Sequence, residues 1–177
     1  MPRYAVLLKG INVGGKKKIA MAELRTLLTD LGYEDVSTYL QSGNALLTSP
    51  QPPAEVAERV EAGIEKQFGK KVRCLVRTHG QLRSVIDAHP LAEAAVTPSW
   101  MFALFLSGPL DPDRVAEQDP RGLAPDQVRL GEGVVYQWCP QGPLEAPDVS
   151  AFLERHHAVT VTARNWNTLV KLAKLTA

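Results

Sequence analysis

The chain has 177 residues, of which 45% are hydrophobic and 22% are charged. This composition predicts a folded protein with one ordinary domain or two small ones, and it excludes a disordered chain. The formal net charge of +1 disfavours a globally basic nucleic-acid-binding protein, although a local basic patch is compatible with it.

Hydropathy predicts no membrane-spanning segment, because no apolar run approaches the roughly 18 residues that a bilayer requires. The apolar run near the N-terminus is short and no small-residue cleavage site follows it, so we expect no signal peptide. Cys74 and Cys139 lie far apart in strand-like segments. We therefore expect a reduced pair of buried thiols and a cytoplasmic protein.

The first part of the chain predicts the order strand, helix, strand, strand, helix, strand. Leucines at helical spacing indicate the first helix, and Pro52 and Pro53 open the second, which Gly69 ends. The expected strands are residues 3–9, 35–40, 44–48 and 72–77, and the first helix is residues 21–31. This order is that of a ferredoxin-like βαββαβ unit.

The same order recurs after a linking helix over residues 81–88. The expected strands are residues 100–106, 128–130, 134–138 and 159–162, and the helices are residues 111–118, 148–156 and 165–175. We predict an α+β protein of two ferredoxin-like units in tandem, with antiparallel sheets, helices on one face, and extra linking and C-terminal helices. The predicted boundaries are 1–78 for the first unit, 79–98 for the linking helix and loop, and 99–177 for the second unit with its closing helix.

The most informative stretch is a glycine-rich turn after the first strand, where residues 8–18 read LKGINVGGKKK. Backbone N–H groups can surround an anion where a strand, a glycine turn and a helix follow one another. The stretch satisfies G-x-x-x-x-G-K, but Lys17 stands where a P-loop needs Ser or Thr to hold magnesium. A P-loop ATPase or GTPase is therefore strongly disfavoured.

Topology brings a second turn, Ser42-Gly43-Asn44, close to the first. In a ferredoxin-like unit the first two strands are parallel, with the third between them, so both end at the same edge of the sheet. Their ends should be about 10 Å apart, given a strand spacing of about 4.8 Å. We expect the two turns to hold a phosphate-sized or larger group, although turn chemistry alone also explains these residues.

A third cluster, residues 162–168, contains Arg164, whose forked side chain suits phosphate or carboxylate. Asn165 or Asn167 can cap the last helix, and Trp166 can pack in the core or stack on a base. The histidines and cysteines lack metal-ligand spacing, so no metal or other cofactor is expected. The predicted ligand-binding residues are Lys9, Gly10, Asn12, Gly14, Gly15, Lys16, Ser42, Gly43, Asn44, Arg164, Asn165 and Trp166.

At these three motifs the chain resembles the bacterial family called domain of unknown function 1697. The matching stretches are YAVLLKGINVGG (4–15), TYLQSGN (38–44) and ARNWNT (163–168). The resemblance covers the whole chain and implies duplicated ferredoxin-like units without implying an activity. Two departures stand out: Lys9 replaces the arginine usual in the family, and Gly142 is followed by Pro-Leu-Glu instead of a frequent Ser-Lys pair.

Three functions are compatible with these residues. The first is a binding module for a phosphate-bearing ligand, and the near-neutral charge favours a phosphorylated small molecule over long nucleic acid. The second is an enzyme acting on a phosphorylated or carboxylated small molecule, although topology places no carboxylate or histidine near the lysine turn. The third is a structural or protein-interaction role. The sequence does not specify an oligomeric state.

Overall fold

The computed structural model describes residues 1–15 and 17–177. Lys16, one of the predicted ligand-binding residues, lies outside the described residues. The chain divides into two compact units. Unit 1 comprises residues 1–82 and 172–177, and unit 2 comprises residues 83–171.

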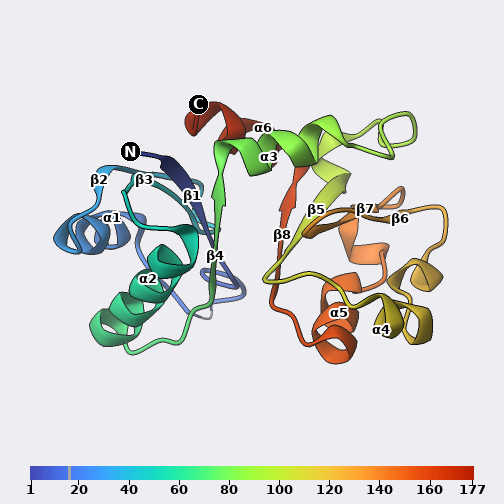
Figure 1. Cartoon of the computed structure of the whole chain (residues 1–177), viewed down its shortest axis with the longest axis horizontal. Helices are drawn as coiled ribbons and strands as arrows, with labels where there is room; N and C mark the ends of the chain where they lie inside the picture. Colours follow the sequence, from blue (N-terminus) through green and yellow to red (C-terminus); the bar gives the residue numbers. More distant parts are fainter. Residues whose placement is uncertain (16) are drawn as a thin grey trace. The chain divides into compact units, whose positions relative to one another are not determined.

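Unit 1 is a four-stranded antiparallel sheet with two helices on one face (Figure 1). Its strands are β1 (Arg3–Leu8), β2 (Glu34–Tyr39), β3 (Asn44–Thr48) and β4 (Cys74–Thr78), and its helices are α1 (Met21–Asp30) and α2 (Pro53–Phe68). The strand order is β2-β3-β1-β4, and each neighbouring pair is antiparallel. β1 therefore lies between β3 and β4.

The core of unit 1 follows from the alternation of side chains along β1 and from helical spacing along α1 and α2. Tyr4, Val6 and Leu8 lie on the face of β1 that the helices cover. They belong to one core cluster with Leu24, Leu28, Val56, Val60 and Ile64. Ala5 and Leu7, on the other face of β1, are also fully buried. Burial on both faces explains why this strand is a nearly continuous apolar run.

Unit 2 contains a second four-stranded antiparallel sheet, with the order β6-β7-β5-β8. Its strands are β5 (Met101–Leu106), β6 (Val128–Leu130), β7 (Val134–Trp138) and β8 (Val161–Asn165), and its helices are α4 (Pro112–Glu117) and α5 (Val149–His157). Val149 and Leu153 of α5 pack against one face of this sheet. Two helices span the unit boundaries: α3 (His79–Asp87) and α6 (Trp166–Leu175).

The two units are built alike where the central strand of each sheet ends. In each unit, the last strand residue donates its backbone N–H to a glycine of the neighbouring turn, and the next residue donates to the residue just before the last strand. In unit 1 these bonds are Leu8–Gly43 and Lys9–Arg73, both 2.9 Å, and in unit 2 they are Leu106–Gly133 at 3.1 Å and Ser107–Thr160 at 2.9 Å. The second unit therefore serves as an internal comparison for the first.

Most helix and strand boundaries lie within two residues of the sequence-based prediction, and two differences are larger. The last strand was expected at residues 159–162, but β8 extends to Asn165, because Arg164 and Asn165 pair with Ala103 and Phe102 of β5. Residues 172–177 were expected in the second unit but belong to unit 1. Within unit 1, Arg3 Nε donates to Leu175 O at 2.8 Å, which ties this segment to the start of β1.

The two equivalent glycines generate a prediction about stability. Gly43 has φ +100°, and a Cβ there would lie 2.8 Å from Ile11 Cγ1 and 3.1 Å from Leu8 Cβ. Gly133 has φ +68° but no neighbour within 4 Å of such a Cβ. Gly43→Ala should lower the free energy of unfolding by about 2–4 kcal/mol through strain and overpacking, and Gly133→Ala by about 1–2 kcal/mol through strain alone. Urea denaturation measures both, and equal losses would contradict the packing argument.

Candidate functional site

The loop between β1 and α1 has an unusual backbone. The φ angle is positive at Gly10 (66°), Asn12 (56°) and Gly14 (59°), and Ile11 and Val13 lie between them without positive φ. Alternation of this kind turns successive N–H groups toward a common side, which is a recurrent geometry for anion binding. Among the described residues, the backbone N–H groups of Gly14 and Gly15 have no hydrogen-bond partner. The N–H groups of these two glycines are therefore candidate donors to a ligand.

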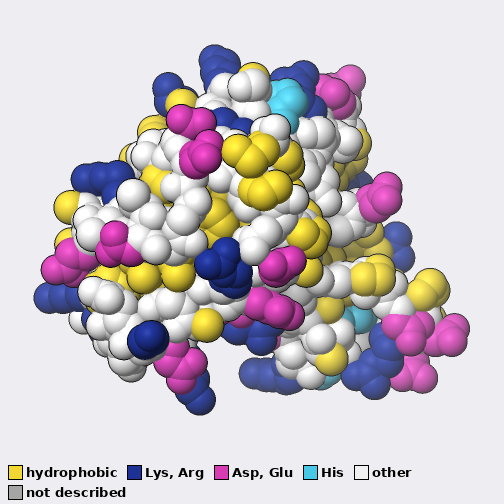
Figure 2. All heavy atoms as spheres, turned by 60° about the vertical axis from the view of Figure 1, so that its left-hand side comes forward, with side chains coloured by type: hydrophobic (Ala, Val, Ile, Leu, Met, Phe, Trp, Pro, Cys, Tyr) yellow, Lys and Arg dark blue, Asp and Glu magenta, His cyan; other side chains and the backbone are white. Residues whose placement is uncertain are grey.

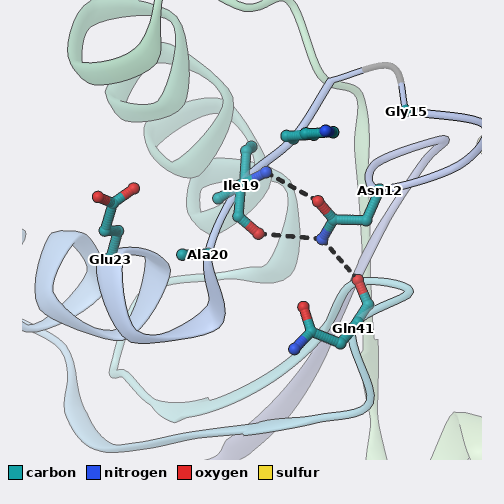
Figure 3. A pocket seen from close by; sticks show the side chains of 7 residues that line it. Asn12, Gly15, Ile19, Ala20, Glu23 and Gln41 are labelled. Carbon is teal, nitrogen blue, oxygen red and sulfur yellow. Dashed lines mark hydrogen bonds between the residues drawn. The ribbon is translucent and has the colours of Figure 1, made fainter.

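Asn12 holds this loop in shape (Figure 3). Its Oδ1 accepts from Ile19 N at 2.8 Å, and its Nδ2 donates to Ile19 O at 3.0 Å and to Gln41 O at 2.7 Å. The last bond joins the β1–α1 loop to the turn between β2 and β3. The two turns therefore lie side by side at one edge of the sheet, as the topology predicts.

The space directly beneath Gly43 is filled, which corrects one part of the sequence-based expectation. Ile11 is fully buried, and its side chain lies against Gly43 so closely that no Cβ fits there. A ligand cannot occupy this position between the two turns. Any bound group has to lie farther along the loop, on the side of Asn12 and Gln41.

A hollow of about 570 Å³ lies on that side. Its lining residues come from the loop, the start of α1 and the β2–β3 turn: Asn12, Gly15, Lys18, Ile19, Ala20, Glu23 and Gln41. Figure 3 shows Glu23 projecting from α1, and Asn12 between Ile19 and Gln41. Lys18 brings a positive charge and Glu23 a negative one, and the two amides add hydrogen-bonding groups. This volume is within the range of small-molecule sites.

The other predicted residues of unit 1 surround this hollow or support it. Gly10, Gly14 and Ser42 are exposed, and Lys9 is partly buried. Asn44 is fully buried, and its Nδ2 donates to Tyr39 O at 2.9 Å across the turn. Asn44 therefore shapes the β2–β3 turn.

The third predicted cluster lies in unit 2. Arg164 is 8% exposed within β8, where one guanidinium nitrogen donates to Thr162 Oγ1 and to Ala163 O, both at 2.8 Å. Asn165 Oδ1 accepts from Thr168 N at 3.0 Å and so caps α6. The ring of Trp166 lies 4.1 Å from that of His89 between centroids. A ligand shared by this cluster and the loops of unit 1 stays a prediction.

The sequence analysis missed a second basic segment, residues 69–73, which leads into β4 and reads GKKVR. Lys17 Nζ donates to Lys71 O at 2.8 Å, and Lys70 Nζ donates to Lys18 O. The two basic loops are therefore joined by reciprocal lysine–carbonyl bonds. Because β4 runs antiparallel to β1, its start lies where β1 ends. The topological argument that joined the first two turns could have located this segment as well.

Arg73 is a further charged residue beside these loops. Arg73 forms an ion pair with Glu61 at 3.2 Å.

Cys74 and Cys139 are buried and form no disulfide, and burial raises the pKa of the Cys139 thiol. Across residues 1–15 and 17–177, no three His, Cys, Asp or Glu side chains are grouped so that they could hold a metal ion. No helix of this described part has both the length and the apolar character needed to cross a membrane.

Two antiparallel sheets and a glycine–lysine loop define an α+β protein with a candidate anion site in its first unit. The chain belongs to the family described as "Protein of unknown function (DUF1697)", whose model matches residues 1–136. This match confirms the resemblance, and it includes the first two of the three motifs. The structure is similar to that of the conserved bacterial protein SP0830 from Streptococcus pneumoniae, with a TM-score of 0.68 and 26% identity, over 99% of this chain and 98% of that chain. No curated protein matches the sequence.

The three hydrogen bonds of Asn12 generate a prediction. Asn12→Gly keeps the positive φ available but removes these bonds. At about 1 kcal/mol per bond, the free energy of unfolding should fall by about 2–3 kcal/mol. Gln41→Ala is the matched control, because Gln41 contributes its backbone oxygen, and it should change stability by no more than about 0.5 kcal/mol. Chemical denaturation would contradict the bracing role if both variants behaved alike.

His89 generates a prediction about pH. Burial lowers the pKa of His89 below its ordinary value of 6.5, and its Nδ1 accepts from Leu91 N, which requires the neutral ring. The unfolded chain therefore takes up this proton first, so stability should fall as the pH drops below about 6.5. His89→Asn retains an acceptor and should flatten this dependence. Thermal unfolding between about pH 7 and pH 5 measures it, and equal slopes in both proteins would contradict the prediction.

Proposed function

We propose that this protein is a binding module for a phosphate-bearing ligand, which it holds in the hollow beside the β1–α1 loop. The observation that supports the proposal most directly is the backbone geometry of the loop. Gly14 and Gly15 present N–H groups without partners among the described residues, next to the hollow that Lys18 lines. Amides of this kind, together with a lysine, supply the directional donors and the charge that a phosphate group needs.

The start of α1 adds a weaker attraction. Ala20 and Glu23 line the hollow, and no side chain caps the N-terminal N–H groups of α1. The partial positive charge of a helix N-terminus favours an anion there. Glu23 acts in the opposite direction, because its carboxylate repels a phosphate. A ligand that carries hydroxyl groups beside its phosphate suits both Lys18 and Glu23, since a hydroxyl can donate to a carboxylate. Nucleotides and sugar phosphates have this combination.

Glu23 also favours a second candidate function. An enzyme acting on a phosphorylated small molecule needs a general acid or base near the bound ligand. The sequence placed no such group at the lysine turn, but Glu23 lines the same hollow as Lys18. In this alternative, Lys18 binds the phosphate and Glu23 accepts a proton from the ligand.

Two finer inferences accompany the proposal. We infer that both units are ferredoxin-like, because in each the first strand lies between the third and fourth strands and the second strand is at the edge, next to the third. We also infer a cytoplasmic location. The absence of a disulfide between Cys74 and Cys139 supports this location, because thiols stay reduced in that compartment.

The proposal predicts a ligand-dependent rise in melting temperature. A screen of inorganic phosphate, nucleotides and sugar phosphates should identify compounds that stabilise the wild-type protein. Lys18→Ala should remove most of this rise. Lys174→Ala, an exposed lysine in α6, is the matched control and should leave the rise intact. The proposal fails if no compound stabilises the wild type, or if Lys18→Ala responds as fully as the control.

Glu23→Gln separates binding from catalysis. For inorganic phosphate, which offers Glu23 no sugar hydroxyl, removing a like charge about 4–5 Å away should tighten binding by about 1 kcal/mol, or roughly fivefold, as measured by calorimetry. If the protein is an enzyme, the same variant should instead lose turnover of the ligand that the screen identifies, as followed by mass spectrometry. Weaker binding in Glu23→Gln would contradict the repulsion argument.

A further inference from the structure

The positive charge of this chain is concentrated in a small part of unit 1. On the face shown in Figure 2, basic and acidic side chains are interspersed, in keeping with the net charge of +1. Residues 9–18 and 69–73 are different, because these fifteen residues include six lysines and Arg73 but no Asp or Glu, although Arg73 is paired with Glu61 of α2. We call these two segments the basic edge. Hydrogen bonds join them: Lys9 N donates to Arg73 O, Lys17 Nζ to Lys71 O, and Lys70 Nζ to Lys18 O.

The backbone hydrogen bonds that close this edge do not require cations. Unit 2 builds the equivalent edge with the same pair of backbone hydrogen bonds, but with residues 107–111 and 158–160. Those segments read SGPLD and AVT, and they contain one Asp and no Lys or Arg. Gly69 and Ala158, which end the preceding helices, both have left-handed φ angles of 66° and 52°. The equivalent pair of backbone hydrogen bonds is thus formed in unit 2 without a cation in these segments, so this pair does not account for the charge of the basic edge.

The arrangement of the cations restricts the kind of anion. They are spread over two loops in the sequence, and of the cations that the structure describes Lys18 alone lines the hollow. Lysine, which supplies six of the seven, is a compact point charge that suits phosphate, whereas paired carboxylates favour the arginine fork. The expected ligand therefore carries several separated phosphates, which extends beyond a single phosphorylated small molecule.

The neighbouring surface is not purely ionic. Val13 and Leu40, on the two turns, are 62% and 50% exposed, and Asn12, Gln41 and Glu23 add polar groups in the hollow. Apolar and hydrogen-bonding groups beside a row of cations match a ligand that alternates phosphates with sugars and bases. A membrane surface fits less well, because it would bury the carboxylate and amides of the hollow, and two aliphatic side chains offer little insertion.

We propose that the basic edge of unit 1 binds the phosphodiester backbone of a single-stranded nucleic acid, with one nucleotide placed in the adjoining hollow. The inference rests on the proposed function and extends it from one phosphate to several. Binding is then electrostatic along the two loops and is selective for an unpaired strand at the hollow. Because binding would relieve the repulsion between like charges, the cations should cost the unbound protein stability.

The test uses a fluorescent single strand of about 20 nucleotides and the double variant Lys70→Gln/Lys71→Gln. Wild-type affinity should fall steeply between about 50 and about 200 mM salt, and the double variant should bind about tenfold more weakly with a salt slope shallower by about 1.4, or 0.7 per cation removed. Its melting temperature without ligand should be equal or higher. Lys71→Gln alone is the second variant, since only the carbonyl of Lys71 joins the two loops, and it should give about half the change in slope. Lys174→Gln should bind as the wild type does.

Several results would overturn the inference. These are the absence of strand binding at the lower salt, equal binding by the double variant, equal binding of a duplex, and tighter binding to vesicles of anionic lipid than to the strand. The same experiment separates this inference from the proposed function, because a mononucleotide or sugar phosphate in the hollow depends on Lys18 and not on Lys70 or Lys71. If such a compound binds and the strand does not, the proposed function stands and the basic edge has no such ligand.

Discussion

The antiparallel pairing of β1 with both β3 and β4 is the constraint on which the candidate site depends. Leu7 pairs with Asn44 at the start of β3, and Leu8 pairs with Cys74 at the start of β4. These two pairs bring the β1–α1 loop, the β2–β3 turn and the segment before β4 to one edge of the sheet. A register shift of one residue in either pair would reverse the faces of the strand and move these loops apart.

Within that edge, neutral groups determine the shape and charged groups are added to it. The amide of Asn12 joins the loop to the turn, Ile11 fills the space beneath Gly43, and Asn44 closes the turn. These contacts use no lysine side chain, so they hold the loop against the turn independently of the charges. A preformed loop of this kind loses little conformational entropy when an anion binds.

The sequence was sufficient for the order of the elements, because β1, β3 and β4 of unit 1 are largely apolar and its helices have clear periodicity. It was also sufficient to place two turns together, since that step needed only the order of the strands. It was not sufficient to predict that Ile11, Asn44 and Arg164 are buried, because burial of a single residue in a loop or at a strand end leaves no periodic signal. Arg164 in particular lies within β8, whose last three residues, Ala-Arg-Asn, show no apolar alternation.

Lys70 and Lys71 were missed for a different reason. Their position follows from the pairing of β4 with β1, which the predicted fold already contained, but the topological argument was applied only to the first two strands. Glu23 was missed because a carboxylate in the first turn of a helix is usual for electrostatic reasons. Its position in the hollow is evident only from the shape of the loop that Asn12 holds.

The division of unit 1 between the two ends of the chain has a consequence for biosynthesis. Arg3 contacts Leu175, and His79 Nδ1 lies 2.8 Å from Ala173 O, so unit 1 includes contacts with a segment that follows all of unit 2 in the sequence. Every residue of unit 2 is therefore translated before unit 1 is complete. A fragment that ends at residue 82 would therefore lack these contacts of unit 1.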